Sequence, residues 1–376
     1  MKNYIKDYVK RVLKERKAGI FGTGNNAGVA EQFLKEIGIR EYVFFDNNEE
    51  KIKNQKNILS PSQINQDYFI LISTIYFQDI KKQLEELGFK ELEDYIWILD
   101  LKYYDALLHF KDEPQVPDIS LSDLDILENE LAQYVKTEKV NWFDEADFEE
   151  FEEKLNFQMI YKKDSNKRYR RKIMEYYCVN KLMQFDMWGN KGIYIDVGAA
   201  ESPFAKHLRE KQGIEAYAVD LTKGSYSELD YYIQEDATNM HFQNNEIRGI
   251  SMQSSFEMFA GDADIKFIKE GARVLEKGGK IVILPLYLHN QYLSTVSPNY
   301  YGSGVADEYS KECVRTDCRG NIPFARFYDL KAFDERVLKT ARQYGLTPLI
   351  YVLPQDLVEK DGFVYLKFIL SLEKTN

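Results

Sequence analysis

GIYIDVGAAES, residues 192–202, is the stretch of sequence that decides the fold. Its residues 193–197 are apolar or alternate between apolar and polar side chains, which predicts a buried strand. Gly198 then breaks the strand, and residues 203–211 have a helical pattern. Glycine lets the backbone approach a ligand closely, and open α/β sheets bind ligands at the carboxyl ends of their strands. The stretch therefore predicts an α/β sheet with a cofactor site at its carboxyl edge.

Further stretches follow in an order that suits a parallel sheet. A second predicted strand, 215–219, ends in Asp220, and an acidic residue there is well placed to accept two ribose hydroxyls. Downstream lie an acidic turn at 234–238 and a strand with its following loop at 250–259. A helix, a glycine pair and another strand occupy 270–283.

Residues 194–203 and these later stretches resemble the cofactor site of class I S-adenosylmethionine-dependent methyltransferases. The resemblance covers residues 165–376. It implies S-adenosyl-L-methionine as the cofactor, with successive acids holding its amino-acid end, its ribose and its adenine. The implied cofactor contacts are Asp196, Gly198, Ala200, Asp220, Leu221, Asp236, Ala237, Gln253 and Ser254.

The end of the chain supports the same fold. Residues 330–344 have a helical pattern, and 347–353 and 363–372 are predicted strands. Two closing strands with a short connection complete the seven-stranded sheet of this family, whose last strand is antiparallel. The expected fold class is therefore α/β, with two Rossmann-like domains joined by a helical connector.

The catalytic base is less evident than the cofactor site. Many relatives that modify small molecules have Glu-His after the fourth strand, but here Glu257 is followed by Met258. His289 lies just past the fifth predicted strand, at the edge where a base belongs, and it is equally compatible with a polar loop histidine. Glu257 is the second candidate for the base. His207 and His241 are interpreted as structural.

Two segments supply candidate substrate contacts. The basic cluster 167–172 begins the helix that lines the cofactor site in methyltransferases, and it is either a solvated face or an anion contact. The insertion 287–328 mixes aromatic residues with glycine, serine and arginine, which suits a sugar with an anionic group or an ordinary surface loop. The candidates are Tyr169, Arg170, Lys172, Tyr300, Tyr301 and Arg326.

The amino-terminal third has its own glycine-rich turn. A strand leads into Gly22-Thr-Gly-Asn-Asn-Ala-Gly28, and a helix and a second strand ending at Asp46 follow. This G-x-G-x-x-x-G is one residue longer than the dinucleotide fingerprint. Three interpretations stay open: a nucleotide or sugar-nucleotide site, NAD-dependent redox chemistry, and a structural or oligomeric role. Candidate nucleotide contacts are Gly22, Gly24, Asn25, Asn26 and Asp46.

The expected domains are a small Rossmann-like domain at 1–105, a helical connector at 106–165 and a methyltransferase domain at 166–376. The first third loosely resembles small Rossmann-like domains fused to enzymes of bacterial surface-polysaccharide loci. Within the connector, the acidic segment 143–157 has aromatic residues at helical spacing. It is either a solvated helix that packs through its aromatics or a cover over the active site.

Composition excludes several classes of partner. The formal net charge of −11 argues against a nucleic-acid backbone as the main partner. The first ten residues are too polar for a signal peptide, and no apolar run is long enough to span a membrane. The cysteines form no disulfide framework, and no metal-ligand spacing is present. We therefore expect a cytoplasmic protein without a metal, and a homo-oligomer is compatible with the sequence.

These observations lead to one main functional hypothesis. The chain is expected to be an S-adenosylmethionine-dependent methyltransferase that O-methylates a saccharide or nucleotide-linked sugar in surface-glycan synthesis. The alternatives are an N- or C-methyltransferase of a small metabolite, and an inactive sugar-nucleotide-binding protein with a methyltransferase fold.

Overall fold

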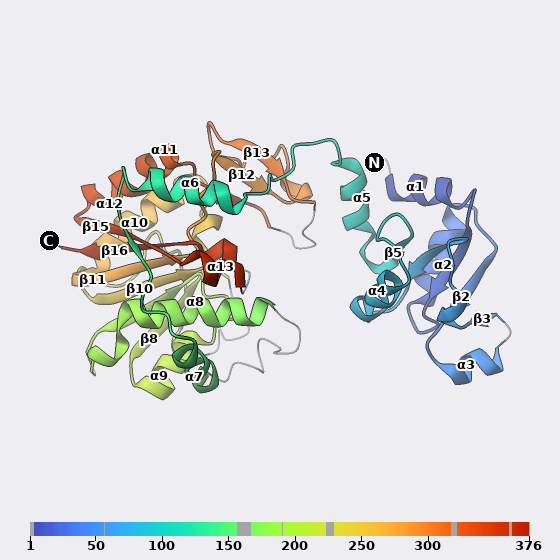
Figure 1. Ribbon diagram of the computed structural model, residues 1–376, viewed down its shortest axis with the longest axis horizontal. Coiled ribbons are helices and arrows are strands. Elements are labelled where there is room, and N and C mark those ends of the chain that lie inside the picture. The colour runs from blue at the N-terminus through green and yellow to red at the C-terminus, as the bar shows by residue number, and fades with distance from the viewer. Residues whose placement is uncertain are drawn as a thin grey trace. The chain divides into compact units, whose positions relative to one another are not determined.

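The computed structural model divides into two compact units, which are described separately (Figure 1). The first comprises residues 1–113 with 316–320, and the second comprises 114–315 with 321–376. The structure describes residues 4–55, 57–155, 167–189, 191–222, 229–316, 322–360 and 363–375.

The first unit is a parallel five-stranded sheet flanked by helices. The strand order is β3-β2-β1-β4-β5. Strands are therefore added first on one side of β1 and then on the other, and the order reverses beside β1. The strands are β1 (Lys17–Phe21), β2 (Tyr42–Phe45), β3 (Ile58–Leu59), β4 (Tyr68–Ile72) and β5 (Tyr95–Trp97). The helices are α1 (Tyr4–Val12), α2 (Ala27–Glu36), α3 (Glu49–Asn54), α4 (Phe77–Glu86) and α5 (Leu101–His109).

Both faces of this sheet are buried, because its strands alternate side chains between two apolar cores. In β1, Ile20 lies in the core shared with α1 and α2, whereas Phe21 lies in the core shared with α4. A parallel sheet covered on both faces opens only at its edges and strand ends. The turn after β1 is therefore where a ligand can reach the backbone.

The second unit is built on an eight-stranded sheet of order β6-β15-β16-β11-β10-β7-β8-β9. β16 is antiparallel to both of its neighbours, and the other pairs are parallel. The strands are β6 (Lys136–Lys139), β7 (Ile193–Val197), β8 (Glu215–Asp220), β9 (Tyr232–Gln234), β10 (Ile247–Gln253), β11 (Leu275–Leu284), β15 (Leu346–Val352) and β16 (Phe368–Lys374).

The eighth strand corrects the sequence prediction, which had seven strands and a purely helical connector. β6 comes from the connector and pairs in parallel with β15, Lys136 opposite Leu349. Its sequence, KTEK, has no apolar alternation and therefore gives no strand signal. Lysine and glutamate suit an edge strand, because their charges discourage pairing with another chain.

Helices cover both faces of the large sheet (Figure 1). One face carries α6 (Leu121–Leu131), α10 (Ala263–Val274), α11 (Leu330–Phe333) and α12 (Lys339–Gln343). The other carries α7 (Glu145–Leu155), α8 (Lys167–Met183) and α9 (Phe204–Gln212). Phe148 and Phe151 of α7 pack on Tyr177 of α8, so the aromatic residues of this acidic helix serve packing.

The insertion after β11 forms a small sheet of its own, in the order β13-β12-β14. Its strands are β12 (Leu293–Val296), β13 (Lys311–Val314) and β14 (Ala325–Phe327). Every residue of β12 is buried, so this part of the insertion is not a surface loop. Within the described part of the chain, no helix is long and apolar enough to cross a membrane.

Candidate active site at the carboxyl edge of the large sheet

Asp196, near the end of β7, lies at the centre of the edge where the sequence predicts the cofactor. Its side chain is completely buried, and Oδ2 accepts a hydrogen bond of 2.6 Å from Ser202. The other oxygen, Oδ1, is buried and has no partner among the described residues. Burial raises the pKa of Asp196 to about 7. An unpartnered buried acceptor of this kind is suited to a donor that a ligand brings.

Gly198 makes the turn after β7 possible. Its φ of +66° is one that residues with a side chain rarely adopt, and an added Cβ would lie 2.5 Å from Cβ of Ser255. Ala200 also has a positive φ, +45°, and its N–H donates to Oδ2 of Asp220 across 2.9 Å. The turn is therefore held against the end of the neighbouring strand β8.

Asp220 ends β8 and is half-buried. Besides Ala200, it accepts bonds of 2.8 Å from the N–H and the hydroxyl of Thr222, both at Oδ1. A carboxylate has about four acceptor positions, so one stays open for a further donor. Leu221, the next residue, is 67% exposed and presents an apolar surface beside that carboxylate.

The third predicted acid, Asp236, follows the next strand along the edge, β9. Gln234 donates to the carbonyl of Leu221 at 3.1 Å, which fixes the end of β9 beside the end of β8. Asp236 is exposed and closes a turn by accepting from the N–H of Thr238 at 2.8 Å. Ala237 is buried in the apolar core. Asp236 therefore lies at the predicted edge, while Ala237 faces the core.

The loop after β10 is tied to helix α8. Ser254 has a φ of +55°, and its hydroxyl donates to Oε1 of Glu175 at 3.0 Å. Glu175 is 1% exposed, and its Oε2 accepts 2.7 Å from Lys172. Gln253 turns inward instead, where its side-chain amide donates to Ser251 at 2.9 Å. Of the two predicted residues, Ser254 thus faces α8 and Gln253 faces the interior.

A cluster of charged and aromatic side chains surrounds Glu175. The hydroxyl of Tyr365 lies 3.2 Å from Oε1 of Glu175, and the Arg171 guanidinium lies 4.8 Å from the centre of the Tyr365 ring. Burial raises the pKa of Tyr287, and the charges of Glu257 and Glu175 raise it further. Glu175 therefore lies among side chains of both charges and two tyrosine rings.

Glu257 belongs to this cluster through its charge. It lies in the short helical turn after β10, and its Oε2 is buried without a partner among the described residues. Burial raises the pKa of Glu257 to about 7, with a further rise from Glu175 and an opposing effect of Lys172 and Arg315. A carboxylate that titrates near neutral pH suits a general base.

His289, the first candidate for the base, is not part of this cluster. It is 2% exposed, its Nδ1 accepts from the N–H of Gln291 at 3.0 Å, and its ring packs edge-on against Phe327. The charged groups that affect it are Asp123 and Lys311. Burial lowers the pKa of His289. The side chain is therefore held inside the protein, its Nε2 has no partner among the described residues, and the assignment of His289 as the base stays a prediction.

Tyr169 and Arg170 are also displaced from the site. Arg170 donates to Glu145 of α7 at 2.7 Å, and its guanidinium lies 4.9 Å from the ring centre of Phe148. Tyr169 is 4% exposed within the same apolar core, and burial raises its pKa to about 12. Residues three and four apart share a helix face, so Glu175 has Arg171 and Lys172 on its side. Of the predicted residues of the basic cluster, Lys172 therefore lies beside Glu175, whereas Tyr169 and Arg170 contact α7 and the apolar core.

Arg326 is a structural residue rather than a substrate contact. It is completely buried, with Nε 2.5 Å from Asp307 and one terminal nitrogen 2.9 Å from Asp264, which is itself buried. Its guanidinium also donates to the carbonyls of Phe259 and Gly261, each at 2.8 Å. Tyr300 and Tyr301 are half-buried, and their role stays a prediction.

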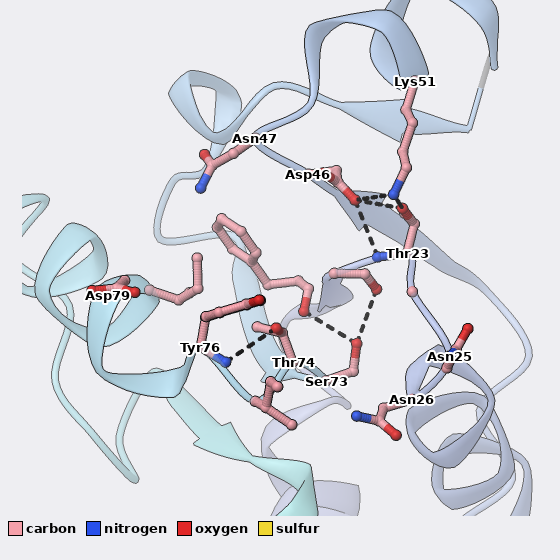
Figure 2. A pocket seen from close by; sticks show the side chains of 15 residues that line it. Thr23, Asn25, Asn26, Asp46, Asn47, Lys51, Ser73, Thr74, Tyr76 and Asp79 are labelled. Atoms are coloured by element: carbon pink, nitrogen blue, oxygen red, sulfur yellow. Dashed lines mark hydrogen bonds and ion pairs between the residues drawn. The ribbon is translucent and has the colours of Figure 1, made fainter.

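The predicted residues of the first unit gather around a separate pocket (Figure 2). Gly22 and Gly24 line it on the turn after β1, with Asn25 and Asn26, and Asp46 lines it from the end of β2. Asp46 is not free for a ribose, because Oδ2 accepts from Thr23 and Lys51 and Oδ1 accepts from the N–H of Asn48. Although burial opposes ionisation, these hydrogen bonds hold the pKa of Asp46 below its usual range.

Potential metal ligands and cysteines are the remaining reactive groups of the described residues. No group of three histidine, cysteine or acidic side chains there could hold a metal ion. Cys178 and Cys313 are buried and unpaired, and Cys318 lies outside the described residues.

Three residues of the cluster were not predicted from the sequence. Glu175 follows Arg171 and Lys172 by four and three positions, so its helix face gave a usable signal. Tyr287 lies just past the end of β11, as a site residue would. Tyr365 comes from the turn before β16, and no local pattern marks it.

Comparison with known proteins identifies a methyltransferase domain in the second unit. A family model described as "Methyltransferase domain" matches residues 195–283. This range holds Asp196, Gly198, Asp220 and Glu257, and it confirms the methyltransferase domain that the sequence predicts there. No curated protein matches the chain.

Several solved structures are similar to the chain. The Burkholderia thailandensis 1,6-didemethyltoxoflavin-N1-methyltransferase, with 1,6-didemethyltoxoflavin and S-adenosylhomocysteine bound, has 11% identity and a TM-score of 0.35 over 70% of this chain and 94% of that one. A possible histamine N-methyltransferase from Thermotoga maritima has 15% identity and a TM-score of 0.31, over 54% and 96%. A putative methyltransferase from Bacillus halodurans has 13% identity and a TM-score of 0.29, over 53% and 99%.

Proposed function

We propose that this chain is an S-adenosylmethionine-dependent methyltransferase that methylates a hydroxyl group of a saccharide or nucleotide-linked sugar. The observation that carries the proposal is the turn after β7 within the matched domain. There a buried carboxylate, Asp196, has one oxygen without a partner, and a glycine, Gly198, has no room for a side chain.

The residues at this edge fit S-adenosylmethionine. The unpartnered oxygen of Asp196 suits the amino group of the cofactor, and Asp220 keeps an acceptor position for its ribose. Leu221 and Asp236 follow on the neighbouring strand ends, where the adenine would lie. When bound, S-adenosylmethionine supplies a methyl group made electrophilic by a positively charged sulfur.

Glu257 is the residue we propose as the general base. Its carboxylate would accept the proton of the acceptor hydroxyl while the oxygen of that hydroxyl bonds to the methyl carbon and the bond from that carbon to the cofactor's sulfur breaks, with S-adenosylhomocysteine as the leaving group. General bases typically contribute about 10²- to 10⁴-fold in rate. A pKa of about 7 makes the Glu257 carboxylate a stronger base than an ordinary glutamate and leaves about half of it ionised at pH 7, so the reaction should weaken at lower pH.

The acceptor is proposed to lie among the side chains around Glu175. Tyr287 and Tyr365 offer flat apolar rings, and Arg171 and Lys172 bring positive charge to the same place. Such a set suits a sugar ring that carries an anionic group, as in a nucleotide-linked sugar. A role in surface-glycan synthesis follows from the loose resemblance of the first third.

Calorimetric titration with S-adenosylhomocysteine tests the cofactor part of the proposal. The wild type is expected to bind in the micromolar range, and Asp220→Asn is expected to bind at least about tenfold more weakly, since it loses a charged acceptor. Asp230→Asn is the matched control, because Asp230 does not lie at the end of a strand that the cofactor would contact, and its side chain is 84% exposed. Lack of binding to folded wild-type protein would sink the proposal and favour the inactive alternative.

A further inference from the structure

The first unit contains a pocket that the methyltransferase proposal does not use. It has a volume of about 620 Å³ and lies where β1, β2 and β4 end, beside the point at which the strand order reverses. Open α/β sheets bind ligands at such a switch point. Pockets of this size, about 300–1,000 Å³, are typical of small-molecule sites.

On one side of the pocket, the ammonium group of Lys51 is held in place by hydrogen bonds (Figure 2). Nζ of Lys51 donates to the hydroxyl of Thr23 at 2.8 Å and lies 3.3 Å from Oδ2 of Asp46. An ammonium has three donors, so one remains for a ligand. The Lys51 side chain is 41% exposed, which lets a ligand reach it. Asp46 therefore positions Lys51 and the turn rather than binding a ribose.

The glycine-rich turn lies next to this ammonium. It leads into α2, and the residue before that helix, Asn26, makes no side-chain bond to the first turn. No side chain caps the first N–H groups of the helix, although those of Ala27 and Val29 donate to the carbonyls of Gly24 and Asn26 at 3.0 Å. Backbone N–H groups just before a helix can donate to a phosphate. Lys51 and the turn residues Gly24, Asn25 and Asn26 line the same cavity, so a phosphate can meet both.

The opposite side of the pocket has exposed apolar surface beside one acid, Asp79. Ile75 and Tyr76, in the loop between β4 and α4, are 69% and 66% exposed. Figure 2 shows Tyr76 and Asp79 across the cavity from Lys51 and Thr23. An exposed aromatic ring at a pocket rim suits stacking on the flat face of a base. Hydroxyl and amide groups line the space between, among them Thr74.

We propose that this pocket binds a nucleoside diphosphate, free or linked to a sugar. The diphosphate contacts Lys51 and the turn before α2, and the nucleoside extends toward Tyr76. Its phosphates need a cation and N–H donors on one side, and its base needs a flat apolar partner on the other, which is the arrangement of this cavity. The proposal does not depend on methyltransferase activity.

Titration of the full chain with UDP, UDP-glucose and ADP tests the pocket, with uridine as the control ligand. At least one diphosphate should bind, and UDP is expected to bind at least about tenfold more tightly than uridine. The comparison among the three shows whether a free or a sugar-linked diphosphate is preferred. If none of them binds at about 1 mM, the proposal is wrong.

Two matched pairs of variants locate the ligand. Lys51→Gln is expected to weaken diphosphate binding about tenfold without affecting uridine, whereas Lys53→Gln, on the same helix and 75% exposed, should change nothing. Tyr76→Ala should weaken all nucleotides, whereas Leu87→Ala, exposed at the far end of α4, should not. Equal effects within either pair contradict the proposal. Displacement of UDP by S-adenosylhomocysteine would also contradict it, because UDP would then occupy the second unit.

Discussion

The hydroxyl of Ser254 donates a hydrogen bond of 3.0 Å to Oε1 of Glu175, which joins the loop after β10 to helix α8. Glu175 is buried and also accepts 2.7 Å from Lys172, so its carboxylate is fixed between the loop and the helix. Glu257 follows Ser254 by three residues, in the short helical turn Phe256–Met258. The proposed base therefore lies just after a loop that is fixed to the basic face of α8.

Glu257→Gln should lower kcat by about 10²- to 10⁴-fold, since glutamine cannot accept the acceptor's proton. In the wild type the rate should rise as the pH increases through about 7, because only the ionised carboxylate acts as a base and burial raises its pKa to that value. The variant should lose this rise. A pH–rate profile of both proteins, with a sugar nucleotide as the acceptor, checks the prediction.

His289→Gln is the matched control for the base. Its side chain is 2% exposed and lies outside the cluster, so the pH at which the rate rises should not move. If the rise disappears in His289→Gln and persists in Glu257→Gln, the assignment of the base is reversed. If neither variant alters the profile, the acceptor is better explained as a nitrogen or carbon that needs no strong base.

Asp196→Asn should change how stability depends on pH. Burial raises the folded-state pKa of Asp196 from 3.8 to about 7, so its contribution to stability is fully present below about pH 4 and is lost as the pH rises through 7. Asparagine does not titrate. The variant should therefore gain stability relative to wild type between about pH 4 and 7, by about 2–4 kcal/mol. Urea unfolding at several pH values measures this, and a pH-independent difference would contradict it.

Gly198→Ala and Gly213→Ala form a matched pair, because both glycines have a φ of +66°. An added Cβ at Gly213 meets nothing within 4 Å, so alanine there costs only the backbone strain, about 1–2 kcal/mol. At Gly198 the Cβ also meets Ser255 at 2.5 Å. Thermal unfolding should show the larger loss for Gly198→Ala, and S-adenosylhomocysteine titration should show weaker binding only there. Equal results would mean that the turn has room to adjust.

Arg326→Met should destabilise the protein by about 3–5 kcal/mol, since it removes the buried cation between Asp264 and Asp307. Among the described residues, Asp307 is then left without an ion-pair partner, while Asp264 keeps Arg336 at 2.7 Å. Arg342→Met is the control, because its ion pair with Asp334 is half-exposed and is worth about 0–1 kcal/mol. Unfolding of both variants by urea compares the two costs. A small loss at Arg326 with a large drop in acceptor affinity would instead restore its assignment as a substrate contact.

Much of the candidate site could be predicted because it lies at strand ends. Asp196 and Asp220 lie at the ends of apolar strands, and Gly198 follows one directly. The ends of neighbouring parallel strands meet at one edge of the sheet, independently of the rest of the sequence. The residues on α8 could not be chosen in this way. A helix turns about 100° per residue, so Arg170 and Arg171 point to different partners although they are adjacent.

The sequence by itself determined the α/β fold, the cofactor edge and the glycine turn at Gly198, because these depend on local patterns of strand, turn and helix. Only the tertiary structure decided that β6 extends the sheet, that Arg326 is buried between two acids, and that Glu257 rather than His289 joins the cluster at Glu175. These outcomes depend on burial and on charges brought together from distant parts of the chain. No local pattern carries that information, since the energy of a charged side chain is set by its neighbours in space.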